Sequence, residues 1–259
     1  MKTFKFFSLC VGVLAFTLTA CDKSNEPNGG NSENPTDTGY KLVKKITVTG
    51  GDDVGIYEYH YTDHNKLSRI TLTPKDGTES SNFVFIQIGD TLFYNTNDYN
   101  YKCKLNSEGN IVEKYTSECA TCPVYTTKYE YNADGYMISR YYTGSNNTGT
   151  YMWENGNLIK DPELLSYVYG TMVSNSNLSV TSYGIDLEVA TLSQFSENGM
   201  SVVVHSGYCG KPSKNLPVRQ ISKWGATSVD YKFDAGNHVT ELTIFDTDGS
   251  SATAYIEYY

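Results

Sequence analysis

Aromatic and polar residues alternate in short runs along most of the chain. Tyr57, Tyr59 and Tyr61 alternate with Glu58 and His60, which is typical of a β-strand that buries one face. A short segment rich in Asp, Asn or Gly follows such a run, and a second apolar run comes after it. The pattern therefore predicts antiparallel β-hairpins.

The hairpins repeat with one common spacing. Four positions after the last aromatic residue of the first strand stands Asn65 in one copy, Gly135 in a second and Asn237 in a third. Only Gly or Asn adopts a positive φ cheaply, so each of these residues is expected at the left-handed position of a turn. A diverged copy keeps the spacing with Gly109, and a shortened copy spans residues 151–158.

Almost all of residues 40–259 fits this description. The exception is Asp161 to Gly170, where a capping Asp, a Pro at the next position and a terminal Gly predict a short helix. Residues 171–195 are compatible with strands or with a second short helix. We therefore expect an all-β domain, an antiparallel meander of hairpins that forms a curled sheet or a barrel-like domain with at most one or two short helices.

The N-terminus predicts export and lipidation. Lys2 and Lys5 precede an apolar run that ends at Ala20 and is too short to span a membrane, so residues 1–20 are expected to be a signal peptide. Leu18-Thr19-Ala20-Cys21 resembles a lipobox, in which the cysteine is acylated and anchors the protein stably. Residues 22–39 lack large apolar side chains and are expected to be a disordered tether to the domain at 40–259.

The charge of the chain excludes one class of partner. The net charge is −9, and loss of the signal peptide removes Lys2 and Lys5 but no acid, which leaves −11. Nucleic-acid binding requires basic clusters that neutralise phosphates, so we expect no nucleic-acid partner. We expect contact with the membrane through the N-terminal lipid only.

The hairpin sequence resembles a known repeat. Tyr-x-Tyr-(Asn/Asp)-x-x-(Gly/Asn)-x-(Leu/Val) is similar to the YD-type repeats of RHS-like proteins. Together with the lipobox, the acidic tether and the final strand Tyr255 to Tyr259, it resembles a Bacteroides-type lipoprotein family of unknown function. The resemblance implies a long antiparallel meander at the outer membrane, facing outward, and supplies no catalytic residues. A membrane-embedded barrel is disfavoured because Lys128 and Glu130 lie on the strand face opposite the tyrosines.

Four cysteines remain after Cys10 leaves with the signal peptide and Cys21 is lipidated. An even number in an exported chain predicts two disulfides, for which three pairings are possible. We favour Cys119 with Cys122, which flank a two-residue loop, and this leaves Cys103 with Cys209. A thioredoxin-like use of the Cys119-x-x-Cys122 motif is disfavoured because strands, not a helix, are expected around it.

The sequence contains none of the catalytic or phosphate-binding motifs that would identify an enzyme. The histidines are scattered, so no metal site and no cofactor is expected. Tyr151 and Trp153 share one strand face and are the best candidates for a ligand platform, although rings of this kind more often fill the inner face of a sheet. The favoured hypothesis is a non-enzymatic surface lipoprotein that binds a glycan or an envelope protein; the alternatives are a glycan-degrading enzyme and a purely structural envelope component.

Overall fold

Twenty strands and no helix form the regular structure of the residues described. The structure is a computed structural model, and it describes residues 39–50, 54–78, 80–95, 100–116, 124–143, 148–162, 166–173, 175–182, 196–197, 200–222 and 225–259. All of them belong to one unit, Thr38–Tyr259. Across these residues no helix is long and apolar enough to cross a membrane.

The first half of the unit is an uninterrupted antiparallel meander in which each strand pairs with the next. Its strands are β1 (Val43–Thr49), β2 (Gly55–Tyr61), β3 (Leu67–Pro74), β4 (Ser81–Ile88), β5 (Thr91–Asn95), β6 (Asn100–Leu105), β7 (Ile111–Thr116), β8 (Tyr125–Tyr131) and β9 (Met137–Tyr142).

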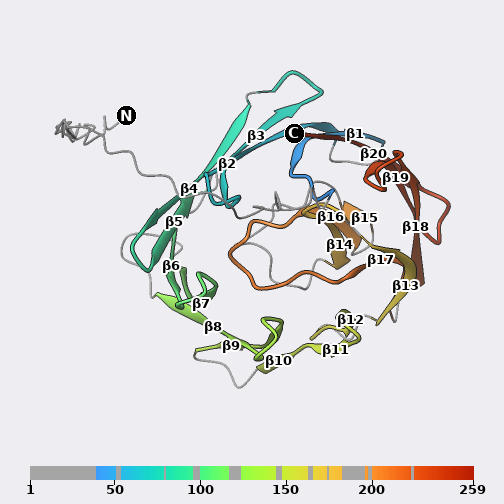
Figure 1. Cartoon of the computed structure of the whole chain (residues 1–259). Coiled ribbons are helices and arrows are strands. Elements are labelled where there is room, and N and C mark those ends of the chain that lie inside the picture. Colours follow the sequence, from blue (N-terminus) through green and yellow to red (C-terminus); the bar gives the residue numbers. More distant parts are fainter. Residues whose placement is uncertain are drawn as a thin grey trace, which may run out of the picture. The chain divides into compact units, whose positions relative to one another are not determined.

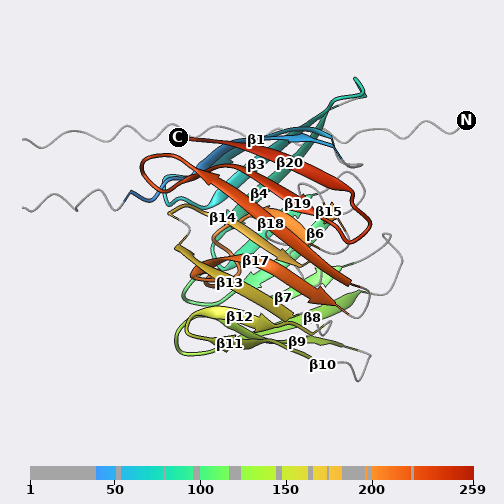
Figure 2. The ribbon, with the colours of Figure 1, turned by 90° about the vertical axis from the view of Figure 1, so that its right-hand side faces the viewer.

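The second half continues the same sheet and closes it. Its strands are β10 (Thr148–Thr150), β11 (Met152–Glu154), β12 (Asn157–Lys160), β13 (Ser166–Val173), β17 (Asn215–Ser222), β18 (Gly225–Phe233), β19 (Val239–Phe245) and β20 (Ser251–Tyr258). β10 pairs with β9, β11 with β12, and the last strand, β20, pairs with the first, β1. The strands therefore form the wall of a barrel, which Figure 1 shows from one end and Figure 2 from the side. This confirms the prediction of an all-β, barrel-like domain.

The wall is weakest between β12 and β13. These strands share one paired position, Lys160 with Ser166. Side chains replace the missing ladder bonds at Leu158, whose carbonyl accepts the hydroxyl of Tyr169 (2.7 Å) and whose N–H donates to Ser213 (3.1 Å). The barrel is thus nearly rather than fully closed by backbone pairing.

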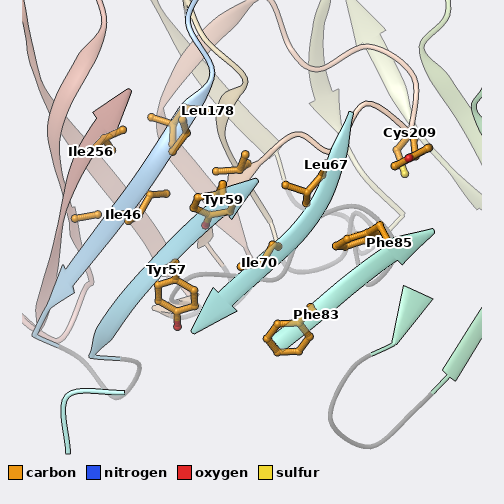
Figure 3. Packing of buried hydrophobic residues seen from close by; sticks show 14 of the residues in the cluster. Ile46, Tyr57, Tyr59, Leu67, Ile70, Phe83, Phe85, Leu178, Cys209 and Ile256 are labelled. Atoms are coloured by element: carbon orange, nitrogen blue, oxygen red, sulfur yellow. The ribbon is translucent and has the colours of Figure 1, made fainter. Parts of the chain in front are cut away.

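A small second sheet lies inside the ring of strands (Figure 1). It consists of β14 (Leu178–Ser182), β15 (Ser196–Glu197) and β16 (Met200–Val204), and we call it the plug. Leu178 and Val204 of the plug are buried in the same apolar cluster as the inner wall of the barrel. Figure 3 shows Leu178 beside wall residues such as Ile46 and Tyr59. The plug therefore packs against the apolar inner wall through Leu178 and Val204.

The turns follow the predicted chemistry. Asn65, Gly109, Gly135 and Asn237 all have a positive φ, between 57° and 86°, which confirms their expected left-handed position. The side-chain oxygen of the residue that opens each turn accepts two backbone N–H groups; these residues are Thr62, Asn106, Asn132 and Asp234. The Asn/Asp of the repeat is thus explained by this local capping.

The prediction of a helix from Asp161 to Gly170 is wrong at its C-terminal half. Val168 and Gly170 lie in strand β13, where Tyr167 points into the core and Val168 is exposed. This two-residue alternation matches the barrel wall, and the wall outweighs the local helix-start signal. In the open segment 171–195, the structure assigns strand to 171–173 and 178–182 among the residues that it describes.

Candidate functional site

One end of the barrel is covered by residues 205–214, which we call the strap. Backbone hydrogen bonds join the strap to successive hairpins of the wall: Leu67 N to Ser206 O (2.9 Å), Ile111 N to Tyr208 O (2.8 Å), Lys211 N to Gly135 O (2.9 Å) and Lys214 N to Gly156 O (2.9 Å). The turns of the repeated hairpins therefore share one end of the barrel, the closed rim, and dock the strap there.

Lys66 adds a cationic contact to the closed rim. Its ammonium lies 4.6 Å from the centre of the Tyr208 ring and donates to the carbonyl of Gly109 (3.1 Å). Desolvation lowers the pKa of Lys66. This side chain links the β2–β3 turn, the β6–β7 turn and the strap.

A second repeated contact joins neighbouring strands just inside the closed rim. In six described strands an aromatic side chain donates to a carbonyl of an earlier wall strand, and we call these contacts latches. They are Tyr61 to Val43 (2.7 Å), Tyr131 to Ile111 (2.8 Å), Trp153 to Met137 (2.6 Å), Tyr169 to Leu158 (2.7 Å), Tyr231 to Pro217 (2.7 Å) and Tyr258 to Val239 (2.8 Å). In the copies that end in Tyr61 and Tyr131, the last aromatic of the repeat thus contributes a hydrogen-bonding group as well as a ring, whereas in the Asn237 copy Tyr231 makes the latch and Phe233 follows it.

We expect Tyr131→Phe to lower the free energy of unfolding by about 1 kcal/mol, because the ring is kept while a desolvated carbonyl loses its donor. Burial raises the pKa of Tyr131, so the phenol is protonated and able to donate. Urea denaturation of the variant measures the loss. Tyr255→Phe, on the exposed outer face, is the matched control, and equal losses in the two variants would contradict the latch.

Tyr151 and Trp153 do not form an exposed platform. Tyr151 is 4 % exposed and belongs to the core. Trp153 is half-buried, donates to Met137 and lies 4.6 Å from the ring of Tyr136. Their shared face is the inner face of the barrel, so the platform hypothesis fails and the alternative of core filling is the better account.

Two of the four cysteines that are candidates for disulfides, Cys103 and Cys209, lie in the described residues. Cys103 on β6 and Cys209 in the strap are both buried and are thiols in the structure. Burial raises the pKa of the Cys103 thiol to about 12, which makes its thiolate scarce at neutral pH. A disulfide between them stays a prediction. Cys21, Cys119 and Cys122 lie outside the described residues.

The described residues include one buried carboxylate and no cluster that could hold a metal. Asp161 is the buried carboxylate in this part of the chain, and it accepts the hydroxyl of Tyr167 (2.9 Å). A glycosidase needs two carboxylates that face one site. No group of three or more His, Cys, Asp or Glu residues that could hold a metal occurs in the described residues.

Two buried cations lie on the inner wall beside aromatic rings. The Lys114 ammonium is 5.7 Å from the Tyr101 ring, which stacks on Tyr94 at 4.5 Å, and the Arg140 guanidinium is 5.4 Å from the Tyr142 ring. Aromatic faces stabilise cations where water is excluded. These contacts help to account for the burial of both cations within a packed wall.

The outer face of the barrel is charged and also carries exposed apolar residues: some form a strip on β4 and β5, and others, such as Val168 and Ile221, lie on β13 and β17. Cross-strand ion pairs join Lys45 with Glu257, Lys128 with Glu113 (3.7 Å) and Lys232 with Glu241 (2.7 Å). As expected, Lys128 and Glu130 are exposed while Tyr129 is buried. The outer strip consists of Ile86, Ile88 and Phe93, which are 53 %, 66 % and 40 % exposed. Ile86 lies opposite Phe93, and Phe93 lies opposite Lys102.

The fold is shared with two solved Bacteroides proteins. A porin-like protein from Bacteroides uniformis ATCC 8492 matches with a TM-score of 0.62 at 12% identity, and one from Bacteroides vulgatus ATCC 8482 with 0.54 at 14%. Each match covers 85% of this chain and 99% of the other. No protein-family model matches the chain, and no curated protein is detectably similar to it. At these identities the similarity shows the barrel fold alone.

Proposed function

We propose that this chain is a non-enzymatic, lipid-tethered barrel of the bacterial envelope that binds a partner protein on its outer face and does not conduct. The observation that carries this is the packed lumen. Wall residues such as Tyr59, Leu67 and Ile70 are 0–1 % exposed and share one cluster with the plug. A conducting barrel of porin type has a polar, water-filled interior.

The outer face supports a tethered rather than an embedded barrel. A lipid-facing wall carries an apolar band, and charged side chains on it are destabilising. On the outer wall of this barrel, Lys232 forms an ion pair with Glu241, and Lys128 forms one with Glu113. Acylation at Cys21, as its lipobox predicts, supplies the membrane attachment that the wall lacks.

The outer strip favours a protein over a glycan as partner. Ile86, Ile88 and Phe93 form a contiguous, largely aliphatic surface, and exposed apolar patches are typical of protein-binding sites. Glycan binding would be favoured by the flat face of a tryptophan, but Trp153 is occupied inside the barrel. Lys102 and Lys104 beside the strip are exposed, so the fitting partner surface is apolar with acidic residues at its edge.

We expect a photoreactive phenylalanine analogue at position 88 to cross-link the full-length protein to an envelope protein in cells, whereas the same analogue at position 221 does not. Ile221 is the matched control because it is also an exposed isoleucine of the outer face (41 %). With the purified partner, Ile88→Glu is expected to weaken binding by at least about tenfold and Ile221→Glu to leave it unchanged.

Three outcomes would overturn the proposal. Equal cross-linking at both positions would remove the outer strip as the site, and cross-linking to polysaccharide alone would make the ligand a glycan. Retention in the membrane of a full chain secreted without lipidation, by Cys21→Ser and a signal peptide that lacks the lipobox, would show that the wall itself is embedded.

A further inference from the structure

Two described histidines, His60 and His205, accept a hydrogen bond at a ring nitrogen, whereas a third, His238, faces acceptors at both ring nitrogens. The guanidinium of Arg69 lies 3.1 Å from Nε2 of His60 and can only donate, and Nδ1 of His205 accepts the N–H of Gly207 (3.3 Å). The rings of His60 and His205 must therefore each keep one nitrogen unprotonated. Desolvation lowers the pKa of His205 to about 4, in agreement with its role as an acceptor.

His238 is surrounded by acceptors instead. Its side chain is 3 % exposed, its Nδ1 lies 3.0 Å from both carboxylate oxygens of Asp234, and its Nε2 contacts the carbonyl of Gly39. The N–H groups of His238 and Gly236, which donate to Asp234, help to hold the pKa of that carboxyl below its usual value, so the carboxylate is ionised and accepts only. A carbonyl also accepts only.

A neutral imidazole could satisfy one of these two partners. The other ring nitrogen would then present a lone pair to an oxygen lone pair in a buried position, which is costly. We infer that His238 is a doubly protonated clasp that fastens the first residues of the domain, Gly39 to Lys41, to the β18–β19 turn through both of its ring nitrogens.

The surroundings of the clasp fit this assignment. Lys41 lies 3.9 Å from Asp234, its N–H donates to the carbonyl of Asn175 (2.9 Å), and the Tyr258 ring is 5.5 Å from the imidazole. Burial raises the pKa of Tyr258 to about 12, so its phenol stays neutral. Asp234, Lys41 and Tyr258 are titratable groups that these contacts place around the ring, and Asp234 supplies the opposite charge.

The clasp sits where the chain leaves the domain towards Cys21. Its consequence for the tether rests on the proposed lipid anchor: release would free residues 39–41 and lengthen the link between membrane and barrel. The protonation of His238 does not depend on the anchor. The two ideas can therefore fail separately.

Nitrogen-15 NMR of the full mature chain, secreted without lipid as Cys21→Ser, tests the inference directly. At about pH 7 both ring nitrogens of His238 are expected to be protonated, while His60 and His205 each show one unprotonated nitrogen. His238→Gln assigns the signals. An unprotonated nitrogen in His238 at this pH would overturn the clasp.

Hydrogen exchange at the Lys41 amide tests the fastening of this segment. We expect its protection factor to fall by about tenfold or more in His238→Gln, which cannot donate to Asp234 and Gly39 together. His64→Gln, which changes an exposed turn histidine, should leave it unchanged. Protection that is the same in His238→Gln as in the unchanged protein would show that the clasp does not hold this segment.

Discussion

Gly210→Ala is expected to destabilise the barrel by about 3 kcal/mol, because the strap has no room for a side chain at this point. Gly210 has a φ of +74°, and a Cβ placed on it would lie 2.5 Å from the carbonyl oxygen of Gly135 and 2.8 Å from the Tyr131 ring. Neither obstacle is the end of a flexible chain: one is backbone, and the other is the ring of a latch that donates to Ile111. The strap must therefore lift from the closed rim or the latch must open.

Differential scanning calorimetry measures this change as a fall in melting temperature of roughly 6–12 °C for a domain of this size. Gly77→Ala is the matched control, since Gly77 has a similar φ of +78° with no atom within 4 Å of the added Cβ. The control isolates the cost of the left-handed backbone, roughly 1 kcal/mol. If Gly210→Ala and Gly77→Ala lower the free energy of unfolding equally, the close approach of the strap to Gly135 does not determine the stability of the barrel.

Local patterns were sufficient to predict the hairpins but not the closure of the barrel. The left-handed residues Asn65, Gly109, Gly135 and Asn237 were predictable because a turn is specified by its own few residues. Closure depends on β1 pairing with β20, for example Ile46 with Ile256. Nothing in either segment identifies the other, because any strand with one apolar face could pair there.

The strap and the latches were missed for a related reason. The strap residues bond to the turns of other hairpins, as Ser206 does to Leu67 and Tyr208 to Ile111, so their sequence carries no periodic pattern of its own. The sequence predicts a ligand platform at Trp153 because tryptophan offers a flat amphipathic surface and Tyr151 shares its strand face. The alignment of Trp153 with Tyr61 and Tyr131, the last tyrosines of two repeats, is the sequence signal for the latch.

Asn177→Leu is expected to lower the free energy of unfolding by about 3 kcal/mol, because one side chain satisfies polar groups of several segments where water is excluded. Asn177 is 3 % exposed. Its Oδ1 accepts the N–H of Val43 at the start of β1 (2.8 Å), and its Nδ2 donates to the hydroxyl of Tyr61 at the end of β2 (2.9 Å). Leucine fills nearly the same volume but leaves the buried N–H of Val43 without an acceptor.

The Asn177→Leu variant also tests whether the plug and the wall contribute separately to the stability of the domain. Asn177 begins the chain segment that enters the lumen, and its own carbonyl accepts the N–H of His205 where the chain returns to the strap (2.7 Å). We therefore expect hydrogen exchange to accelerate at Val43 and along the strap before the rest of the wall opens, with urea denaturation giving the total loss. Asn175→Leu is the control, because its amide makes an exposed bond to Gly236 (3.3 Å) of small net value. A uniform acceleration over all strands would mean that plug and wall unfold as one cooperative unit, and that the inner sheet is an integral part of the core rather than a separately docked element.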